Sequence, residues 1–457
     1  MSGAVRAGRG GELGAGLRLG LRAMGRFVVA LGLAWSAAAL AGPPVPKAEA
    51  TYRQLELFAR VLSYVQNNYV ETVDEQQLMQ GAIKGMLETL DPHTVYMPPD
   101  VFKEMKIDTS GEFGGLGIEI ARRNDSIVVV APVDDTPAQR AGIKPGDQLL
   151  KIDDEPTRSM ELTRAIQKMR GPAGKKVLLT IMREGFAAPR EFAIIRDHIR
   201  IASVESALFG GIGYVKVKNF QERTDASLFK ELEKLRGQNG GKELRALVID
   251  LRNNPGGLLD QAVAIADRFL PGGQLIVSTR GRDGAQVTEE RAKERDTEKP
   301  YPIVVLVNAG SASASEIVAG ALQDHKRAVL MGVPTFGKGS VQTVIEMEDG
   351  SGLKLTIARY YTPSGRSIQE RGILPDFLVG ESEGVLTKTE SVREKDLKRH
   401  FRGEGDGPEL ASLKPSLPEN LKAWEVTEKL TDYQLKVALN YLNGAAVSAG
   451  KSTARAP

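Results

Sequence analysis

The segment from residue 303 to residue 322 constrains the fold of this chain more than any other. It opens with five apolar, mostly β-branched residues (303–307, IVVLV), continues through a turn of small residues (308–313, NAGSAS) and becomes an amphipathic run from Ile317 to Leu322. This order predicts a buried strand, a tight turn and a helix, as in an α/β sheet. The free N–H groups at the start of such a helix can stabilise a negatively charged oxygen.

The turn carries three serines, at positions 311, 313 and 315. Ser313 and Glu316 have the spacing of a capping box, which places Ser313 at the helix start. Ser311 and Ser315 are then expected in the turn and in the first helical turn. A serine hydroxyl beside a helix N-terminus is a candidate nucleophile, but it needs a neighbouring base to take its proton.

Lys338 is the candidate base. It lies between two glycines in the segment 335–342 (TFGKGSVQ), where Phe336 and Val341 can exclude water from its ammonium. Desolvation lowers the pKa of a lysine and makes the neutral amine available. Gln342, if this segment enters a strand, can orient the amine by a hydrogen bond. Alone, Lys338 would be a surface lysine in a glycine turn, but together with the serine turn it favours a serine–lysine hydrolase.

Other catalytic chemistries receive little support. The chain has no cysteine, which excludes disulfides and thiolate sites. Its histidines lie in separate regions without metal-ligand spacing, and the one at 325 is interpreted as a solvated residue at a polar helix end. The segment 332–339 is similar to a phosphate-binding loop, but Gly339 replaces the Ser or Thr that would hold magnesium. The histidines in these separate regions are His93, His198, His325 and His400. We expect no metal, nucleotide or other cofactor.

Residues 1–41 are interpreted as a cleavable secretory signal. Five arginines precede an apolar run (27–40) that ends in small residues and is too short for a comfortable transmembrane helix. Met24 is an alternative start, and a retained anchor is the alternative to cleavage. Five of the 61 basic and one of the 58 acidic residues lie in this segment, which leaves 56 and 57. The sequence indicates a periplasmic or secreted protein and gives no support for nucleic-acid binding.

The rest of the chain is expected to form several domains of α+β and α/β character. Residues 42–106 are predicted to be a linker and a helical arm, which includes a helix near 75–90, with residues 52–106 packing on the core. Residues 107–201 are β-rich, and residues 202–380 alternate buried strands with helices. Residues 381–457 form a charged extension with a final helix over 432–442.

Four segments resemble the carboxyl-terminal processing (tail-specific) proteases, and they occur in the order of that family. They are the serine and lysine segments, residues 250–260 (DLRNNPGGLLD) and residues 361–369 (YTPSGRSIQ). The resemblance covers nearly the whole chain after the signal and implies a protease core with crotonase-like or ClpP-like layering. It also implies that Ser313 is the nucleophile, Lys338 the general base and Gln342 the residue that orients the base.

The resemblance also implies an oxyanion hole. Its donors would be the backbone N–H of Ala314 and that of Gly256 or Gly257, in a Pro-Gly-Gly turn where the backbone can approach a ligand closely. A tight turn between strand and helix explains the same glycines equally well and is compatible with this role.

The β-rich region resembles a PDZ domain. Residues 114–118 (GGLGI) resemble its carboxylate-binding loop, and residues 141–149 (AGIKPGDQL) strengthen the match. Backbone N–H groups in such a loop hold a terminal carboxylate while the next strand adds the peptide as an extra strand. In related proteases this module gates the active site, and an arginine at the position that resembles Arg170 helps to hold the active arrangement; a solvated cation at a helix end is the alternative. The loop residues are Gly114, Gly115, Leu116, Gly117 and Ile118.

The sequence therefore predicts a secreted or periplasmic serine endopeptidase that captures protein substrates with apolar C-termini. The resemblance implies a homodimer formed by the helical arm and the final helix, and an activating adaptor protein is a further expectation. No contact with nucleic acid is expected, and contact with a membrane only through an uncleaved signal. The alternative is a non-catalytic PDZ adaptor or chaperone of the same fold.

Overall fold

The computed structural model describes residues 47–123, 125–284, 287–294, 297–383, 391–404, 417–418 and 421–453. The predicted signal (1–41), the alternative start at Met24 and most of the linker lie outside these residues. The chain divides into two compact units, Met1–Gly81 and Ala82–Pro457, and each is described by itself.

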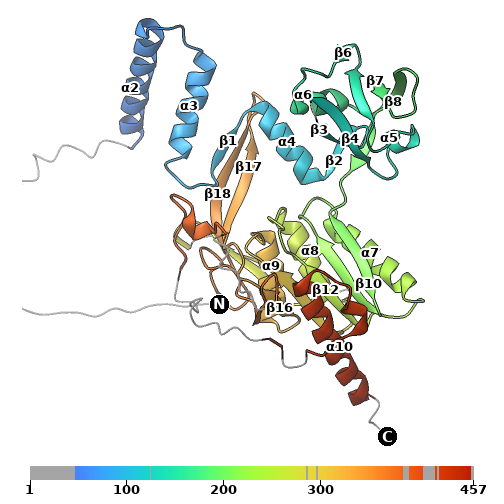
Figure 1. The fold of residues 1–457 in the computed structure, drawn as a ribbon. Helices are drawn as coiled ribbons and strands as arrows, with labels where there is room; N and C mark the ends of the chain where they lie inside the picture. Colours follow the sequence, from blue (N-terminus) through green and yellow to red (C-terminus); the bar gives the residue numbers. More distant parts are fainter. Residues whose placement is uncertain are drawn as a thin grey trace, which may run out of the picture. The chain divides into compact units, whose positions relative to one another are not determined.

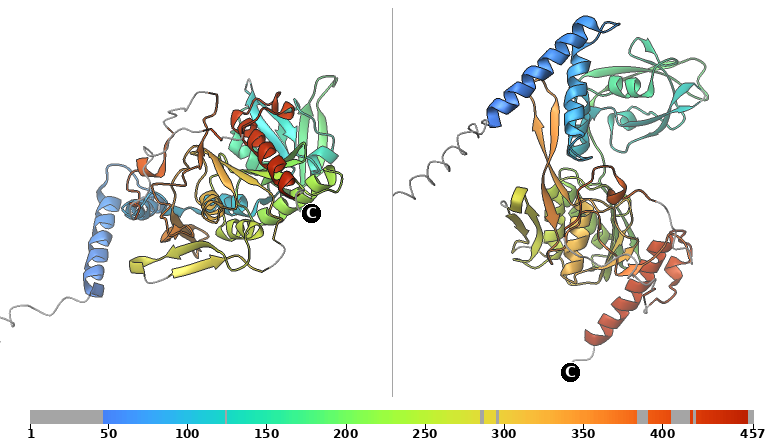
Figure 2. Two further views of the ribbon diagram at one scale, coloured as in Figure 1. Left: turned by 90° about the horizontal axis from the view of Figure 1, so that it is seen from below. Right: turned by 90° about the vertical axis from the view of Figure 1, so that its left-hand side faces the viewer.

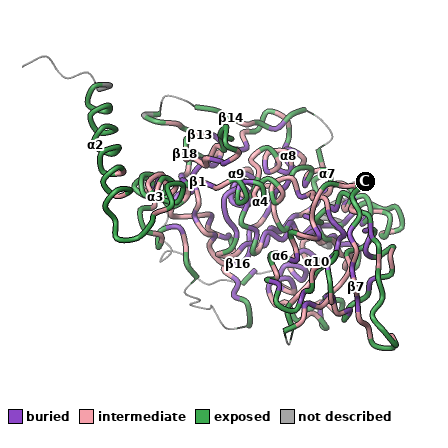
Figure 3. Tube along the Cα trace, turned by 90° about the horizontal axis from the view of Figure 1, so that it is seen from above, coloured by how far each residue is buried: buried purple, intermediate pink, exposed green. Residues whose placement is uncertain are grey.

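The first unit contains α2 (Lys47–Asn68) and the start of α3 (Glu75–Leu87). The spacing of apolar residues predicts both helices, but α3 ends at Leu87 rather than at residue 90. Residues 88–90 form a turn instead, in which the N–H of Leu90 binds the carbonyl of Leu87 at 2.9 Å. Helix α2 is exposed along its length (Figure 3), and its exposed side chains include Tyr52, Leu55 and Phe58. None of the helices in the described part of the chain is long and apolar enough to cross a membrane.

The second unit begins with a region built around an antiparallel sheet. Its strand order is β3-β4-β5-β7-β8, with β6 paired to β5, while β2 pairs with β9. Alternate residues of these strands point into a core closed by α6 (Leu162–Met169). Helix α4 (Pro99–Ser110) leads into this region, so the predicted domain boundary at residue 107 falls inside a helix. The strands are β2 (Glu112–Gly115), β3 (Ile118–Arg123), β4 (Ser126–Pro132), β5 (Gln148–Ile152), β6 (Glu155–Pro156), β7 (Lys176–Met182), β8 (Arg190–Ile195) and β9 (Asp197–Arg200), and a short helix, α5 (Pro137–Arg140), lies between β4 and β5.

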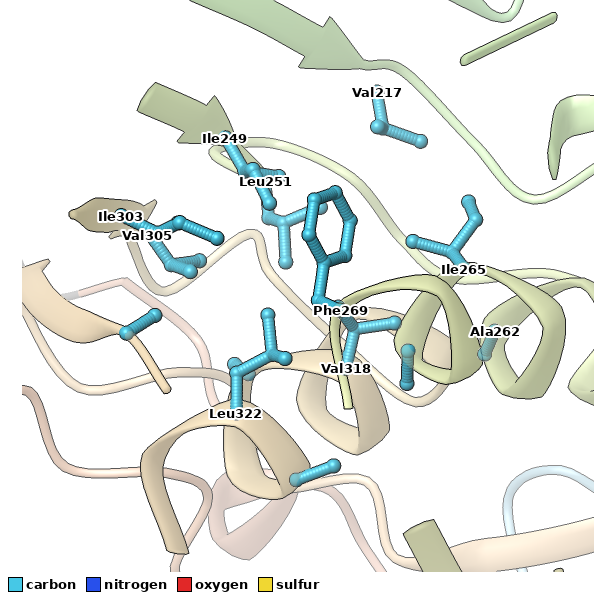
Figure 4. Close-up of a cluster of buried hydrophobic side chains, with 14 of the residues drawn as sticks. Val217, Ile249, Leu251, Ala262, Ile265, Phe269, Ile303, Val305, Val318 and Leu322 are labelled. Atoms are coloured by element: carbon cyan, nitrogen blue, oxygen red, sulfur yellow. The ribbon is translucent and has the colours of Figure 1, made fainter. Parts of the chain in front are cut away.

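A mostly parallel sheet forms the centre of the second unit. Its order is β10-β11-β12-β15-β16-β19; β10 is antiparallel to β11, and the other neighbours are parallel. One face packs against α7, α8 and α9, and Figure 4 shows this core, with Ile249 and Val305 from the strands beside Phe269 and Val318 from the helices. The elements are β10 (Val204–Phe209), β11 (Ile212–Val217), α7 (Thr224–Gln238), β12 (Ala246–Asp250), α8 (Leu259–Phe269), β15 (Ile303–Val307), α9 (Ala314–Asp324), β16 (Val329–Gly332) and β19 (Phe377–Leu378).

The opposite face of this sheet packs against α10 (Tyr433–Thr453). Val248 and Val304 alternate with the residues that face α8 and α9, so both faces of the strands are buried and the strands are apolar throughout. Helix α10 extends well past residue 442, where the sequence pattern placed its end, and Figure 1 shows it beside β12.

The second unit also contains another antiparallel sheet, built around β18. Strand β18 pairs with β17 and also with β1 and β13, and β13 pairs with β14. Strands β17 and β18 form a long ribbon that extends away from the parallel sheet (Figures 1 and 2). The strands are β1 (Val95–Met97), β13 (Leu275–Arg280), β14 (Val287–Arg291), β17 (Ser340–Glu346) and β18 (Gly352–Tyr361).

The topology places three loops at one edge of the parallel sheet. The loops that follow β12, β15 and β16 all leave from the carboxyl ends of parallel strands, which is where ligands bind in open α/β sheets. They contain residues 251–258, 308–313 and 333–339. These are three of the segments that the sequence pattern singled out.

Candidate active site

Ser313 lies at the sharp turn between β15 and α9. It is the N-cap residue of α9, as the capping-box spacing predicts, and the carboxylate of Glu316 accepts its N–H at 2.7 Å. Its φ of 53° and ψ of −111° are unusual for a residue with a side chain. Such strain persists only where the surrounding structure holds it, and it concentrates at functional sites.

The three serines of the turn are not equivalent. The hydroxyl of Ser311 donates to the carbonyl of Leu251 at 2.8 Å, and that of Ser315 donates to the carbonyl of Asn254 at 3.0 Å. Both side chains are fully buried and tie the turn to the loop after β12, whereas Ser313 retains 8% exposure. Ser311 and Ser315 therefore hold the turn in place, and Ser313 is the least buried of the three serines.

Lys338 follows β16 and is half-buried. Burial, together with the nearby ammonium of Lys354, lowers the pKa of Lys338 to about 8, and the carboxylates of Glu394, Glu316 and Asp91 oppose this shift. Burial also lowers the pKa of Lys354. A substantial fraction of Lys338 is thus neutral at slightly alkaline pH, as a general base requires.

Glu316 joins the serine turn to the lysine loop. Its Oε2 accepts the N–H of Ser313 and, at 3.0 Å, the N–H of Lys338. Its Oε1 accepts the N–H of Gly337 at 2.7 Å and the hydroxyl of Thr335 at 2.5 Å. Burial raises the pKa of Glu316 to about 7, although these donors favour the ionised form. The capping-box spacing indicated the bond to Ser313, but nothing in the sequence indicated the bonds to the lysine loop.

The side chains of the predicted catalytic residues are not bonded to one another in this structure. No hydrogen bond joins Ser313, Lys338 and Gln342, all of which are described residues. Gln342 lies on β17, as predicted, but its amide donates to the carbonyl and hydroxyl of Ser340 at 3.1 and 2.9 Å. The predicted bond from Gln342 to Lys338 is therefore absent in this conformation.

The loop after β12 brings its glycines against Ser313. A Cβ built on Gly256 would lie 2.9 Å from Cβ of Ser313 and 3.0 Å from N of Ala314. The N–H of Gly256 donates to the side chain of Asn254 at 2.9 Å, so it is already used. Gly257 forms an isolated bridge with Phe220 whose hydrogen bonds use the carbonyl of Gly256 and the N–H of Leu258. The N–H of Gly257 consequently points to the other side of the loop.

A buried ionic cluster anchors the same loop and was not anticipated from the sequence. Arg252 donates to Asp250 at 2.6 Å and to Asp432 at 2.6 Å, and Tyr214 donates to Asp250 at 2.9 Å. Arg252 also donates to Gln434 on α10 at 3.0 Å. The loop is thereby connected to the C-terminal helix at Gln434, 182 residues further along the chain. No periodicity reveals a pair at that separation.

The predicted peptide-binding loop lines an open pocket of about 230 Å³ between β3 and α6. Gly115, Leu116, Gly117 and Ile118 line it, together with Ile120, Ile166 and Met169. Gly114 does not; a Cβ on Gly114 would lie 2.0 Å from the carbonyl oxygen of Gly171, so its absence allows two backbone segments to approach. The pocket has an apolar wall and a glycine-rich end.

Arg170 is the C-cap residue of α6 and lines this pocket, with its side chain partly exposed. Its guanidinium forms an ion pair with Glu104 on α4 and lies over the ring of Phe113, 4.6 Å from the centroid. Its Nε is buried without a hydrogen-bond partner in the described part of the chain. Arg170 thus links the pocket to helix α4.

The histidines are more engaged than the sequence suggested. His93 Nε2 lies 2.9 and 3.0 Å from the two carboxylate oxygens of Glu394, and His400 Nε2 lies 2.5 Å from Glu370. The interpretation of His325 as a solvated residue was wrong, because its ring is half-buried and bonds to the carbonyl of Leu275 at 2.7 Å. Within the described ranges no group of His, Asp and Glu side chains is arranged to hold a metal ion.

Comparison with known proteins gives three family matches along the chain. Residues 37–101 match the activating protease CtpB N-terminal domain, residues 104–182 match the PDZ domain, and residues 211–379 match peptidase family S41. The three matches lie in the same order as the predicted arm, PDZ domain and core.

Curated relatives extend over most of the chain. A carboxy-terminal-processing protease of Bartonella bacilliformis is 43% identical over 86% of this chain and 89% of its own length. A carboxyl-terminal-processing protease of Synechocystis is 39% identical over 65% of this chain and 70% of its own. Among solved structures, the photosystem II D1 C-terminal processing protease is 30% identical, with a TM-score of 0.42 over 71% of this chain and 86% of that one. On the strength of the family matches and the curated relatives, the chain belongs to peptidase family S41 as a carboxy-terminal processing serine protease with a PDZ domain.

Proposed function

We propose that the protein is an endopeptidase that cleaves with a serine–lysine dyad, in which Ser313 is the nucleophile and Lys338 the general base. The observation that carries this proposal is the shared carboxylate of Glu316, which binds the backbone N–H of both residues while burial lowers the pKa of Lys338 to about 8. The strained N-cap conformation of Ser313 supports it, as does the engagement of Ser311 and Ser315 in structural bonds.

The chemistry follows from these positions. The neutral amine of Lys338 takes the proton of Ser313 as Oγ attacks the carbonyl carbon of the scissile peptide bond. The N–H groups of Ala314 and Gly257 stabilise the oxyanion that forms, and Gly256 contributes the sharp turn rather than a donor. When the intermediate collapses, Lys338 returns its proton to the departing amine and an acyl ester remains on Ser313. The same amine then activates water, which hydrolyses the ester.

A rotation of side chains completes the dyad when substrate binds. Ser313 and Lys338 are held by their backbones but do not hydrogen-bond, and Gln342 bonds to Ser340. In the proposed active state Gln342 turns its amide oxygen towards the ammonium of Lys338 and orients it. Catalytic hydrogen bonds are often long or misaligned before substrate arrives, so the observed conformation is compatible with this role.

The PDZ pocket supplies the substrate in this proposal. Its wall of Ile118, Ile120, Ile166 and Met169 fits an apolar C-terminal side chain, and the N–H groups of the loop 115–118 fit the terminal carboxylate. Arg170, at the rim, is positioned to transmit occupancy of the pocket to α4 through Glu104. An activating protein partner is part of the same proposal, as is regulation by the substrate tail.

The proposal includes the organisation of the whole chain. Residues 1–41 direct export to the periplasm or the cell exterior, residues 42–106 form the arm, residues 107–201 the PDZ domain and residues 202–380 the protease core with crotonase-like layering. Residues 381–457 form the extension, and its last helix together with the arm forms a homodimer.

The decisive experiment compares variants of residues 42–457 on a disordered protein with an apolar C-terminus. Ser313→Ala and Lys338→Ala are expected to lose cleavage, and Lys242→Ala, which removes an exposed lysine, to keep it. A fluorophosphonate probe is expected to label the wild type at Ser313. If Lys338→Ala retains full activity, the dyad is wrong. If the wild type binds the substrate but neither cleaves it nor reacts with the probe, the protein is a PDZ adaptor.

A further inference from the structure

A segment from the C-terminal extension covers the lysine loop. Residues 391–404, called here the C-terminal strap, lie outside the residues that match the peptidase family. Arg393 donates to the carbonyl of Thr335 at 3.1 Å, and the N–H of Glu394 donates to the carbonyl of Phe336, also at 3.1 Å. The strap thus binds the backbone immediately before Lys338.

The carboxylate of Glu394 is linked through the side chain of Gln369 to Gly339, the residue after Lys338. Glu394 is fully buried, and its Oε1 accepts a hydrogen bond from the amide of Gln369 at 2.8 Å. The amide oxygen of Gln369 accepts the N–H of Gly339 at 2.9 Å. Two hydrogen bonds therefore connect Glu394 to the residue that follows Lys338, while its own N–H holds the residue two positions before it.

His93 secures this carboxylate from a distant part of the sequence. Its Nε2 lies 2.9 and 3.0 Å from the two oxygens of Glu394, across a separation of 301 residues. A buried carboxylate is costly unless it is paired and hydrogen-bonded, so this contact fixes where Glu394 can lie. His93 belongs to the segment just before β1, in which Asp91 accepts the N–H of His93 at 2.8 Å and the hydroxyl of Thr356 at 3.1 Å.

We propose that Glu394 is a positioning residue for Lys338, and that the C-terminal strap is part of the active site. This inference rests on the proposed function. Through Gln369 and Phe336 the strap holds backbone groups of the lysine loop that Glu316 does not bind. Its carboxylate also contributes to the electrostatic field in which Lys338 loses its proton.

The electrostatic effect has a definite sign. The charged groups that act most strongly on Lys338 are Lys354 on β18, Glu394 on the strap, Glu316 on α9 and Asp91 before β1. The three carboxylates favour the ammonium, and Lys354 disfavours it. Neutralising Glu394 therefore makes the neutral amine available at lower pH, whereas a purely structural role would leave the pH dependence unchanged.

The test is the pH profile of kcat/KM for Glu394→Gln, which keeps the shape of the side chain and removes its charge. The acidic limb is expected to shift to lower pH by about half a pH unit. The maximal kcat is expected to fall about tenfold because the loop of the base is held less well. If the acidic limb of kcat/KM stays at the wild-type pH in Glu394→Gln, the inference is overturned, whatever the loss of activity.

Glu370→Gln is the matched control. Glu370 also bonds to a histidine, His400, and to the backbone of the strap at Gly403, but its carboxylate is not among the groups whose charge acts most strongly on Lys338. This variant is expected to keep the acidic limb at its wild-type position, and any fall in kcat then reports the lost contacts with the strap. An equal shift in both variants would reveal a general charge effect and overturn the specific role of Glu394.

A second variant keeps the inference testable if Glu394→Gln does not fold. Gln369→Asn shortens the link to Gly339 and keeps the carboxylate, so kcat should fall while the limb stays in place. Wild-type kcat in Gln369→Asn overturns the inference. The failure of the proposed function would look different, because Ser313→Ala or Lys338→Ala would then retain activity irrespective of these variants.

Discussion

Ser313 and Lys338 share one hydrogen-bond acceptor, Oε2 of Glu316, which lies 2.7 Å from the first N–H and 3.0 Å from the second. The serine turn follows β15 and the lysine loop follows β16, which are neighbours in the parallel sheet. A single buried carboxylate therefore fixes the spacing of the two backbone segments before any substrate arrives. In the proposed dyad, only the side chains then have to rotate before catalysis.

Glu316→Gln tests this clamp. The amide has one acceptor oxygen in place of two, and its NH₂ group would face N–H donors. One or more buried donors lose their partner, which is expected to destabilise the fold by about 1–3 kcal/mol and to lower kcat at least about tenfold. Thermal unfolding and steady-state kinetics measure the two effects. Glu348→Gln, an exposed change in the turn between β17 and β18, should alter neither.

The stability contribution of Glu316 should itself depend on pH. Burial raises the pKa of Glu316 from its ordinary value of 4.5 to about 7, so the folded protein binds this proton more tightly than the unfolded chain. The contribution is full below pH 4.5 and declines as pH rises through 7. The loss of stability between these values should therefore be smaller in Glu316→Gln than in the wild type. Equal losses would show that the carboxylate is already ionised at low pH in the folded state.

The charge of Lys354 offers an independent test of what sets the pKa of Lys338. Burial and the ammonium of Lys354 lower the pKa of Lys338 to about 8, so activity is expected to rise with pH through that value as the amine becomes neutral. Lys354→Met removes the like charge and keeps an apolar stem, which raises the pKa of Lys338. The acidic limb of kcat/KM should move to higher pH, opposite in direction to the shift expected for Glu394→Gln. A limb that does not move would show that burial alone sets the pKa.

The sequence was sufficient for the backbone of the site but not for its side-chain contacts. Ser313 could be placed because a capping box is a local pattern, and the approach of the serine and lysine loops follows from the carboxyl ends of parallel strands. The contact of His93 with Glu394 joins residues 301 positions apart and follows no periodicity. The orientation of Gln342 towards Ser340 depends on a rotamer that the residue type does not determine.

Gly257 is expected to be required for activity, because the loop has no room for a side chain there and its N–H is a proposed oxyanion donor. Its φ is +143°, and a Cβ would lie 2.2 Å from the carbonyl oxygen of Phe220. Gly257→Ala must shift the loop and with it the N–H proposed to stabilise the oxyanion, so kcat is expected to fall about 10²–10³-fold with a smaller change in KM. Gly237→Ala, on helix α7 with open space around the position, is the control and should stabilise the fold slightly. Comparable activity in both variants would remove Gly257 from the oxyanion hole.

The PDZ pocket makes a prediction about substrate choice rather than about chemistry. Ile166 on α6 lines the pocket, and Ile166→Glu places a carboxylate where the proposal puts an apolar side chain and a terminal carboxylate. Burying that charge is unfavourable and the two carboxylates repel, so KM for substrates with an apolar C-terminus should rise at least about tenfold. Gln167→Glu introduces the same charge at an exposed neighbouring position of the same helix and should leave KM unchanged.

Blocking the substrate C-terminus as an amide should raise KM for the wild type. The increase should be much smaller for Ile166→Glu, because the variant has already lost the contact. If the amide and the free acid are cleaved equally by the wild type, substrates reach Ser313 without capture of their C-terminus in this pocket.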